Sequence, residues 1–274
     1  MSTPHPPARL TARGLSAGYP GRRVIEDLDL TIAPGKVTAL IGANACGKST
    51  LLGVLARLNA PLGGSVELDG TGIASIPRRR FAQTVGLLPQ HPTAPEGITV
   101  AELVSRGRYP HRGVFQRWSA DDGARVDDAM ATTGVAELAD RPVGDLSGGQ
   151  RQRVWIAMAL AQAPEILLLD EPTTFLDLSH QIEVLDLLRS LNRTQGTTVV
   201  AVLHDLNLAA RYADELVVMA AGRIVAHGAP TEVLTAEVVS QAFGLESLVI
   251  PDPLTGTPLI VPIPGGAHSS ADPR

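Results

Sequence analysis

The stretch Gly42-Ala43-Asn44-Ala45-Cys46-Gly47-Lys48-Ser49 decides the fold, because it fits the pattern G-x-x-x-x-G-K-[S/T]. The apolar run Val37–Ile41 precedes it, and a helical stretch from about Lys48 to Asn59 follows it. Between a strand and a helix, successive backbone N–H groups and the positive end of the helix point into one concavity that holds phosphate oxygens. We therefore expect a phosphate-binding loop in which Lys48 reaches the β- and γ-phosphates of a nucleotide and the Ser49 hydroxyl is a ligand of Mg²⁺.

Two residues of this loop add to the prediction. Lys48 and Lys36 are the only lysines among 23 basic residues, which favours a specific role for the compact ammonium group of Lys48 over a glycine turn without a ligand. Cys46 is the single cysteine, so the chain has no internal disulfide, which fits a reducing compartment. For Cys46 itself we favour a small residue packed beneath the phosphates over a redox-active thiol.

The composition excludes several classes of protein. Hydrophobic residues make up 44% and charged residues 19% of the 274 residues, enough for a large core. The net charge of −5 argues against a free-standing nucleic-acid binder, and an aromatic content of 3% is too low for a base-stacking platform. No apolar run approaches the ~18–20 residues that span a bilayer, and no secretory signal is visible at Met1–Leu10. We expect any membrane association to come through a partner.

Strands and helices alternate through much of the chain. Glu165–Leu169 is a continuous apolar run, typical of a central strand buried on both faces, and Thr197–Leu203 is rich in β-branched residues. Between them, apolar residues recur every three positions, as on the buried face of a crossover helix: Ile182, Leu185, Leu188 and Leu191. The pattern predicts an α/β fold with a mainly parallel sheet covered by helices.

The remaining segments depart from this alternation. Leu10–Ile32 predicts antiparallel strands at one edge of the sheet. Pro92–Leu146 lacks β-branched runs and predicts a helical insert, with helices at Thr99–Arg106 and Ala120–Thr133. Further on we expect a hairpin from Leu216–Met219 and Arg223–Ala226, one helix over Thr231–Phe243 with Thr231 as its N-cap, and strands at Leu248–Ile250 and Leu259–Pro262 around a Pro/Gly-rich turn.

Four polar residues stand at the ends of expected strands. Asp170 and Glu171 follow Glu165–Leu169, and side chains alternate along a strand, so the two carboxylates have different roles. We expect Asp170 to bind Mg²⁺, directly or through water, and Glu171 to polarise the water that attacks the γ-phosphate. Gln90 follows an apolar stretch that would deliver its amide to the metal and the water. His204 would hydrogen-bond the γ-phosphate. The alternative for each is an ordinary polar strand end.

A second glycine-containing motif, Leu146-Ser147-Gly148-Gly149-Gln150, precedes the Ala-rich helical run Arg151–Gln162. Ser147 is a natural N-cap, whereas two glycines weaken a helix. A helix start without side chains makes sense where an anion must approach its N–H groups closely. No phosphate in the same subunit is obviously available, so we expect the target to be a nucleotide bound by a second copy of the chain.

With these motifs in order, the sequence resembles an ATP-binding-cassette (ABC) ATPase subunit from about Arg9 to Ile263. The combination of the phosphate loop, LSGGQ and ILLLDEP is highly specific, and Gln90, Phe175-Leu176-Asp177 and His204 complete it. The resemblance implies a P-loop NTPase (RecA-like) parallel-sheet core with an N-terminal antiparallel β edge and an inserted helical subdomain. It also implies a head-to-tail homodimer in which two ATP molecules lie between one subunit's phosphate loop and the other's serine cap.

The resemblance assigns roles to the site residues, with ATP and Mg²⁺ as cofactors. Tyr19 matches the aromatic residue that stacks on adenine, and Asp177 matches the loop that crosses between subunits. The residues expected to bind ATP are Tyr19, Gly42, Ala43, Asn44, Ala45, Cys46, Gly47, Lys48, Ser49 and Thr50. Those expected to contact the partner's ATP are Ser147, Gly148, Gly149, Gln150 and Asp177. The expected catalytic residues are Glu171, His204 and Gln90, and the expected ligands of Mg²⁺ are Ser49, Gln90 and Asp170.

One residue departs from the family pattern, because glycine is commoner where this chain has Ala45. If that position needs a positive φ, the Cβ costs about 1 kcal/mol. The resemblance also divides the chain, with a single cassette domain over residues 9–263. Its parts are a nucleotide-binding core (9–91 and 154–230), a helical subdomain with the LSGGQ motif (92–153), a C-terminal helix and hairpin (231–263) and a disordered tail (264–274).

Finer matches narrow the expected function. Ser105–His111, Pro172–Leu188 and Val202–Asp214 resemble importers of iron–siderophore complexes, with cobalamin and haem importers close by. This implies a subunit that powers separate integral membrane permease subunits from the cytoplasmic side of the membrane. An extracellular or periplasmic substrate-binding protein would be an indirect partner, and no nucleic acid would take part. We expect the groove beside Gln90 and Thr99–His111 to dock a short cytoplasmic helix of the membrane partner.

Two alternatives to a transporter subunit stay open. One is a soluble ABC ATPase that is not coupled to transport, although the chain has a single LSGGQ and no heptad pattern. The other is a P-loop GTPase or kinase. Common guanine readers use an Asn-Lys dipeptide, and here glycines, Gly35 and Gly47, precede both lysines.

Overall fold

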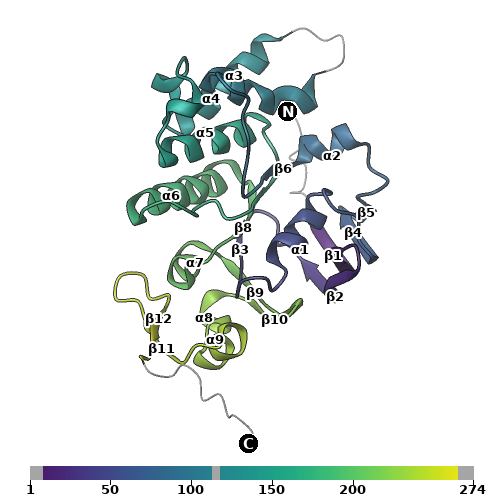
Figure 1. The fold of residues 1–274 in the computed structure, drawn as a ribbon, viewed down its shortest axis with the longest axis vertical. Coiled ribbons are helices and arrows are strands. Elements are labelled where there is room, and N and C mark those ends of the chain that lie inside the picture. Colours follow the sequence, from purple (N-terminus) through teal and green to yellow (C-terminus); the bar gives the residue numbers. More distant parts are fainter. Residues whose placement is uncertain (1–8, 113–117, 265–274) are drawn as a thin grey trace, which may run out of the picture.

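A six-stranded sheet lies at the centre of the computed structural model, which describes residues 9–112 and 118–264 (Figure 1). In spatial order β10-β9-β3-β8-β7-β6, the strands are Arg223–Gly228, Glu215–Ala220, Val37–Gly42, Thr198–Val202, Ile166–Leu169 and Val85–Leu88. All are parallel except β10, which forms the predicted hairpin with β9. The mainly parallel sheet expected from the sequence is confirmed. The tail predicted over 264–274 lies outside the described residues, apart from Pro264.

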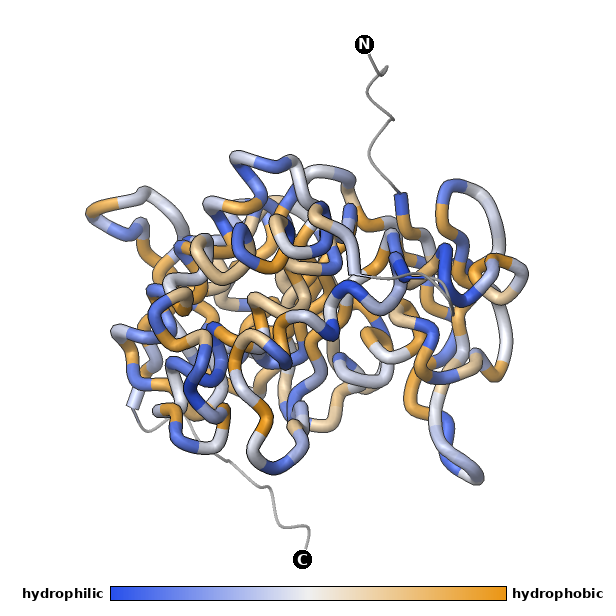
Figure 2. The backbone as a smooth tube through the Cα atoms, turned by 90° about the horizontal axis from the view of Figure 1, so that it is seen from above, coloured by the Kyte–Doolittle hydropathy of each residue, from blue (hydrophilic) through white to orange (hydrophobic). Residues whose placement is uncertain are grey.

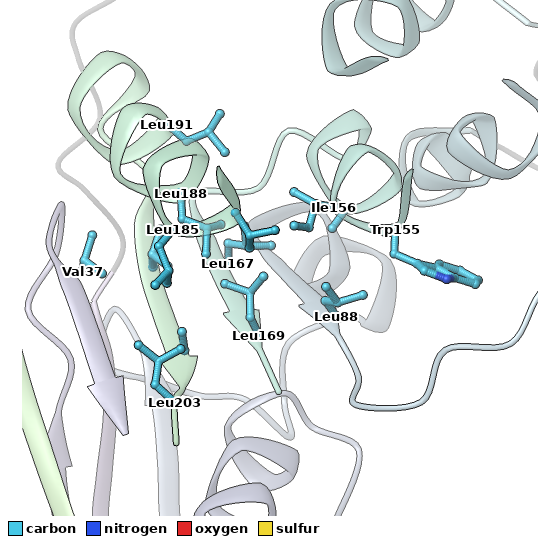
Figure 3. Close-up of a cluster of buried hydrophobic side chains, with 14 of the residues drawn as sticks. Val37, Leu88, Trp155, Ile156, Leu167, Leu169, Leu185, Leu188, Leu191 and Leu203 are labelled. Carbon is cyan, nitrogen blue, oxygen red and sulfur yellow. The ribbon is translucent and has the colours of Figure 1, made fainter. Parts of the chain in front are cut away.

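Both faces of this sheet are buried, and β7 shows why its sequence is continuously apolar. Leu167 and Leu169 point to one face and belong to the larger of two hydrophobic clusters, shown in Figure 3. The other two residues of β7 point to the opposite face and belong to the second cluster. The crossover helix α6 (Leu178–Gln195) covers the first face with its predicted apolar stripe. The fully buried members of the stripe are Leu185, Leu188 and Leu191.

A separate antiparallel sheet faces the second cluster. Its order is β2-β1-β4-β5, and its strands are Arg22–Thr31, Leu10–Tyr19, Gly63–Leu68 and Thr71–Gly72. The antiparallel pairing predicted within Leu10–Ile32 is present, but the strands form their own sheet and not an edge of the parallel one. The reason is α1 (Lys48–Leu55), in which seven of eight residues are buried, so it needs apolar cover from both sheets.

Helix α1 is also shorter than expected, since it ends at Leu55 and does not continue to about Asn59. Arg57 has φ 59°, a left-handed conformation that stops a right-handed helix. The backbone N–H of Leu58 then donates to the carbonyl of Gly53, which closes the end of the helix. After β5, the short α2 (Arg78–Thr84) leads into β6.

Helical segments form the part of the chain between β6 and β7. They are α3 (Val100–Ser105), η1 (Arg106–His111), α4 (Ala120–Thr132), η2 (Ala136–Leu138), η3 (Val143–Asp145) and α5 (Gly148–Ala161). The helices predicted at Thr99–Arg106 and Ala120–Thr133 are therefore confirmed. Each begins with a capping box, at Thr99 and Ser119 respectively, which satisfies the free N–H groups of its first turn.

The C-terminal part corrects one prediction, because the single helix expected over Thr231–Phe243 is two helices. They are α8 (Pro230–Val233) and α9 (Ala236–Phe243). Leu234 leaves the helical region with ψ 81°, and the hydroxyl of Thr235 caps α9 by accepting from the N–H of Val238. Thr235, and not Thr231, is thus the N-cap of α9.

A hairpin ends the described chain and packs against α7 (Leu206–Tyr212). Its strands are β11 (Ser247–Pro251) and β12 (Pro258–Pro262), which confirms the predicted pair. In Figure 2, apolar stretches run through the middle of the molecule and hydrophilic stretches occupy many surface loops. Within the described residues, every helix is too short or too polar to cross a bilayer.

Candidate functional site

The phosphate-loop motif connects the end of β3 to the start of α1 with an unusual backbone. Gly42 has φ 152°, and a Cβ there would lie 2.2 Å from the carbonyl oxygen of Met219 on the neighbouring strand. Gly47 caps α1 with φ 111°. Only glycine fits such positions without strain. Ala45 has φ 61°, so this departure from the family does place a Cβ in the left-handed region.

Lys48 lies folded over the loop. Its Nζ donates to the carbonyl oxygens of Gly42 at 2.8 Å and Ala43 at 3.0 Å, and the residue is only 5% exposed. The Sγ of Cys46 is 3.9 Å from the same nitrogen and is also buried. The ammonium group is therefore held by backbone carbonyls of the loop beside the start of α1, where a phosphate would meet both the ammonium group and the N–H groups of the first helical turn.

The two acids that follow β7 have different partners, and Glu171 lies in a turn with φ 55° beyond the end of the strand, so alternation along the strand does not itself set their directions. The Oγ of Ser49 donates to Oδ1 of Asp170 at 3.0 Å. The Oε1 of Glu171 lies 2.8 Å from Nε2 of His204, and the Oγ1 of Thr174 donates to Oε2 of Glu171 at 2.9 Å. Residues from three separate strand ends thus meet at the carboxyl edge of the sheet, where ligands of parallel sheets bind.

The surroundings also separate the proton affinities of the two acids. Burial raises the pKa of Asp170 and outweighs the hydrogen bond from Ser49, which lowers it. Burial also acts to raise the pKa of Glu171, but hydrogen bonds from His204, Thr174 and Gln90 outweigh it and lower the pKa. Glu171 is therefore ionised at neutral pH, in the state that accepts a proton.

A cavity of about 260 Å³ lies beside the loop. Its lining residues are Tyr19, Arg22, Val24, Asn44, Ala45, Gly47, Lys48, Ser49, Thr50 and Glu171. Arg22 and Val24 were missed by sequence reasoning, because they belong to no motif and reach the cavity from the start of β2, after the turn that joins it to β1. The aromatic Tyr19 just before that turn was the available signal.

The second glycine motif lies elsewhere on the subunit. Ser147 caps α5 by accepting from the N–H of Gln150, whose Oε1 accepts from the N–H of Ser147 at 3.1 Å. Gly148 has no neighbour within 4 Å of an added Cβ, whereas at Gly149 that atom would lie 2.5 Å from the ring of His180. Sequence reasoning attributed both glycines to a close-approaching anion, and at Gly149 the contact with His180 is a second reason for the missing Cβ. None of residues 147–150 lines the cavity.

Asp177 caps α6 at the surface. Its carboxylate accepts from the N–H of His180 at 3.0 Å and from the Oγ of Ser179 at 2.8 Å, and Nδ1 of His180 lies 2.7 Å from it. These bonds, the backbone bond first, lower the pKa of Asp177 to about 2. Phe175 and Leu178 beside it are 89% and 62% exposed.

The donor set near the loop suits a hard cation. Ser49, Asp170 and Gln90 offer hydroxyl, carboxylate and amide oxygens, which are ligands that Mg²⁺ accepts in proteins while keeping phosphate and water ligands. Among the described residues there is no cluster of three or more His, Cys, Asp and Glu that would suit a transition metal. The residues present therefore fit Mg²⁺.

Comparison with known proteins identifies the family of this chain. The model of the ABC transporter family matches residues 25–174, from β2 through the strand-end acids. The chain therefore belongs to the ABC transporter family, and the ATP-binding proteins of that family are ATPases. The family resemblance read from the motifs is confirmed.

Individual relatives cover nearly the whole chain. The ferric enterobactin transport ATP-binding protein FepC of Escherichia coli is 52% identical over 97% of this chain and 98% of its own. The achromobactin transport ATP-binding protein CbrD of Dickeya dadantii is 54% identical over 92% of this chain and 94% of its own. The cobalamin import ATP-binding protein BtuD of Halobacterium salinarum is 42% identical over 96% of this chain and 66% of its own.

Solved structures agree with the fold. An ABC transporter in an inward-facing conformation matches with a TM-score of 0.80 and 29% identity, over 93% of this chain and 98% of that one. A bacterial ABC transporter cassette solved as a dimer matches with a TM-score of 0.71 and 27% identity, over 80% and 98%. The ABC ATPase cassette fold is confirmed.

Proposed function

We propose that the chain is the ATP-hydrolysing subunit of a membrane importer for iron–siderophore complexes. The observation that carries the ATPase is the meeting of Lys48, Ser49 and Glu171 at one cavity, with His204 on Glu171. The siderophore class is supported by relatives named for ferric enterobactin and achromobactin at 52% and 54% identity, against 42% for one named for cobalamin.

Binding of ATP would use the loop and its flanks. The backbone N–H groups of residues 42–50 and the Nζ of Lys48 hold the phosphates, and the exposed ring of Tyr19 stacks on adenine. Ser49, Asp170 and Gln90 would hold Mg²⁺, which would supply neutralisation of phosphate charge.

Hydrolysis would depend on Glu171, which orients water and accepts its proton. Both carboxylate oxygens already accept hydrogen bonds, from His204 and from Thr174. Each carboxylate oxygen can accept more than one hydrogen bond, so water can bind Glu171 beside these donors. A shift of His204 from Glu171 towards the γ-phosphate frees one oxygen and lets His204 sense the phosphate.

A second copy of the chain would complete each site. Ser147, Gly148, Gly149 and Gln150 are proposed to contact the partner's ATP, together with Asp177. In support, none of them lines the cavity of its own subunit. The open space at Gly148 leaves the positive end of α5 accessible, and the exposed apolar side chains beside Asp177 offer a contact surface.

A groove of about 610 Å³ next to the helical segments is the proposed docking site for the permease. It is lined by Glu96, Gly97, Ile98, Glu102, Ser105, Arg106, Tyr109, Arg112 and Trp118. Tyr109 and Trp118 are 59% and 44% exposed, and such amphipathic aromatics suit a partner helix. The subunit would then act on the cytoplasmic side of the membrane, and a substrate-binding protein outside would be an indirect partner.

The division of residues 9–263 into core, helical subdomain and C-terminal part stays a prediction.

The variant Glu171→Gln tests the ATPase. We expect it to bind ATP, to lose at least about 10²-fold of its turnover and to accumulate as an ATP-dependent dimer on size-exclusion chromatography. The exposed Glu137→Gln is the matched control and should behave as the unchanged protein. An ATP-bound variant that stays monomeric would count against the shared site.

Uptake of ferric siderophore and of cobalamin, compared in cells carrying Glu171→Gln, tests the substrate class.

A further inference from the structure

Helices α5 and α6 begin side by side, and one histidine fills the space between them. The ring of His180 lies against Gly149 so closely that an added Cβ would be 2.5 Å from Cδ2 and 3.0 Å from Cγ and Nε2. Non-bonded carbons normally stay about 3.5–4.0 Å apart. The ring therefore rests directly on bare backbone, and only glycine at position 149 permits this.

The opposite side of the same ring is tied to Asp177. Nδ1 of His180 lies 2.7 Å from Oδ1 of Asp177, and the backbone N–H of His180 donates to the same oxygen at 3.0 Å. Further along, Nη1 of Arg153 on α5 pairs with Oε2 of Glu183 on α6 at 2.6 Å. The two helix starts are thus joined at two successive points.

We propose that His180 is a positioning residue that holds the serine cap of α5 and Asp177 in one fixed arrangement, so that both reach the partner's nucleotide together. This inference rests on the proposed function, in which both elements act on the other subunit's ATP. His180 does not line the cavity of its own subunit. Its loss should therefore impair the partner's site and leave its own phosphate loop, Glu171 and His204 intact.

The chemistry of the side chain supports this role. A flat ring is needed to cover Gly149, and a ring nitrogen is needed for the bond to Asp177. Alanine removes both contacts, so the distance between the start of α5 and Asp177 is no longer fixed. Because a displacement of about 1 Å can cost up to about 10²-fold in rate, we expect His180→Ala to lower hydrolysis about tenfold and to raise KM for ATP. Asparagine, which keeps an amide N–H near the position of Nδ1, should restore part of the loss.

Mixing subunits separates action across the dimer from action within one chain. His180→Ala keeps a complete phosphate loop and Glu171, whereas Glu171→Gln keeps a complete serine cap but cannot hydrolyse ATP. In the mixed dimer, one of the two sites combines the phosphate loop and Glu171 of the His180→Ala chain with the serine cap of the Glu171→Gln chain. We expect an equimolar mixture to hydrolyse ATP several-fold faster than either variant alone at the same total concentration.

The other outcomes decide against the inference. If mixing yields only the average of the two separate rates, His180 acts within its own chain and the proposal is wrong. A His180→Ala rate equal to that of Arg193→Ala, an exposed control at the far end of α6, would overturn it as well. If alanine fails to fold, the same mixing with His180→Asn gives the answer. A parent chain with neither hydrolysis nor an ATP-dependent dimer would instead refute the proposed function.

Discussion

Arg108→Ala should lower the free energy of unfolding by about 3–5 kcal/mol, because it removes one partner of a buried ion pair. The Arg108 and Asp122 side chains are only 5% and 8% exposed, and Nε donates to Oδ1 of Asp122 at 2.9 Å. Nη1 also donates to the carbonyl of Ala161 at 2.8 Å, at the end of α5. One guanidinium group thus holds η1, α4 and α5 together, and alanine leaves a buried carboxylate without its cation.

Arg125→Ala is the matched control, since Arg125 pairs with Asp121 on the exposed side of the same helix. That pair is 3.7 Å apart, with side chains 53% and 69% exposed, so its loss should cost about 0–1 kcal/mol. Urea unfolding followed by tryptophan fluorescence measures both, because Trp118 and Trp155 lie in this region. Equal midpoints for the two variants would refute the reasoning.

The same pair has a predictable dependence on pH. A hydrogen bond from Ser119 and then one from Arg108 lower the pKa of Asp122 to about 2, below its ordinary value of 3.8. The depressed pKa stabilises the fold above about pH 4, and this contribution is lost as pH falls through about 2. In Arg108→Ala the loss between these values should be smaller, although Ser119 keeps part of it. A steeper acid dependence in the variant would contradict the assignment.

Three further changes test other parts of the structure. Because Ala45 has φ 61°, Ala45→Gly should raise the free energy of unfolding by about 0.5–1 kcal/mol in urea, and a decrease would show that the loop tolerates Cβ. His204→Ala should lower kcat about 10²-fold with little change in ATP affinity by calorimetry, and unchanged turnover would contradict its role at the γ-phosphate. The ion pair with Arg211 lowers the pKa of Asp252 to about 2, so the stability that this pair contributes is lost as pH falls from about 4 to 2. Asp252→Asn should make the free energy of unfolding less dependent on pH in this range. An unchanged acid titration curve for the variant would disprove this prediction.

Much of the site could be predicted because most of its functional side chains lie in short continuous segments of the sequence. Gly42 and Gly47 have positive φ angles that favour glycine. Lys48 and Ser49 follow at fixed spacing at the start of α1. Asp170 and Glu171 directly follow the buried apolar run of β7, which marks them as acids at the end of a strand. Such features need only a few consecutive residues, so a pattern of residue types reveals them.

Other features could not be predicted, because they depend on how separate helices and strands pack against one another. Gly107 looked like part of a family signature, yet a Cβ there would lie 2.1 Å from the carbonyl oxygen of Met158 on α5. Arg108 beside it is buried, and Arg22 reaches the cavity from the start of β2, outside any motif. The N-terminal strands likewise form a separate sheet, which helps to bury α1 on nearly all sides.

The sequence by itself determined the loop between β3 and α1, the position of two acids directly after β7 and the capped start of α5, since each follows from local backbone geometry and residue chemistry. Only the tertiary structure decided that His204 meets Glu171 and that His180 rests on Gly149. These contacts join residues far apart in the chain, and close packing of whole helices and strands fixes their distances.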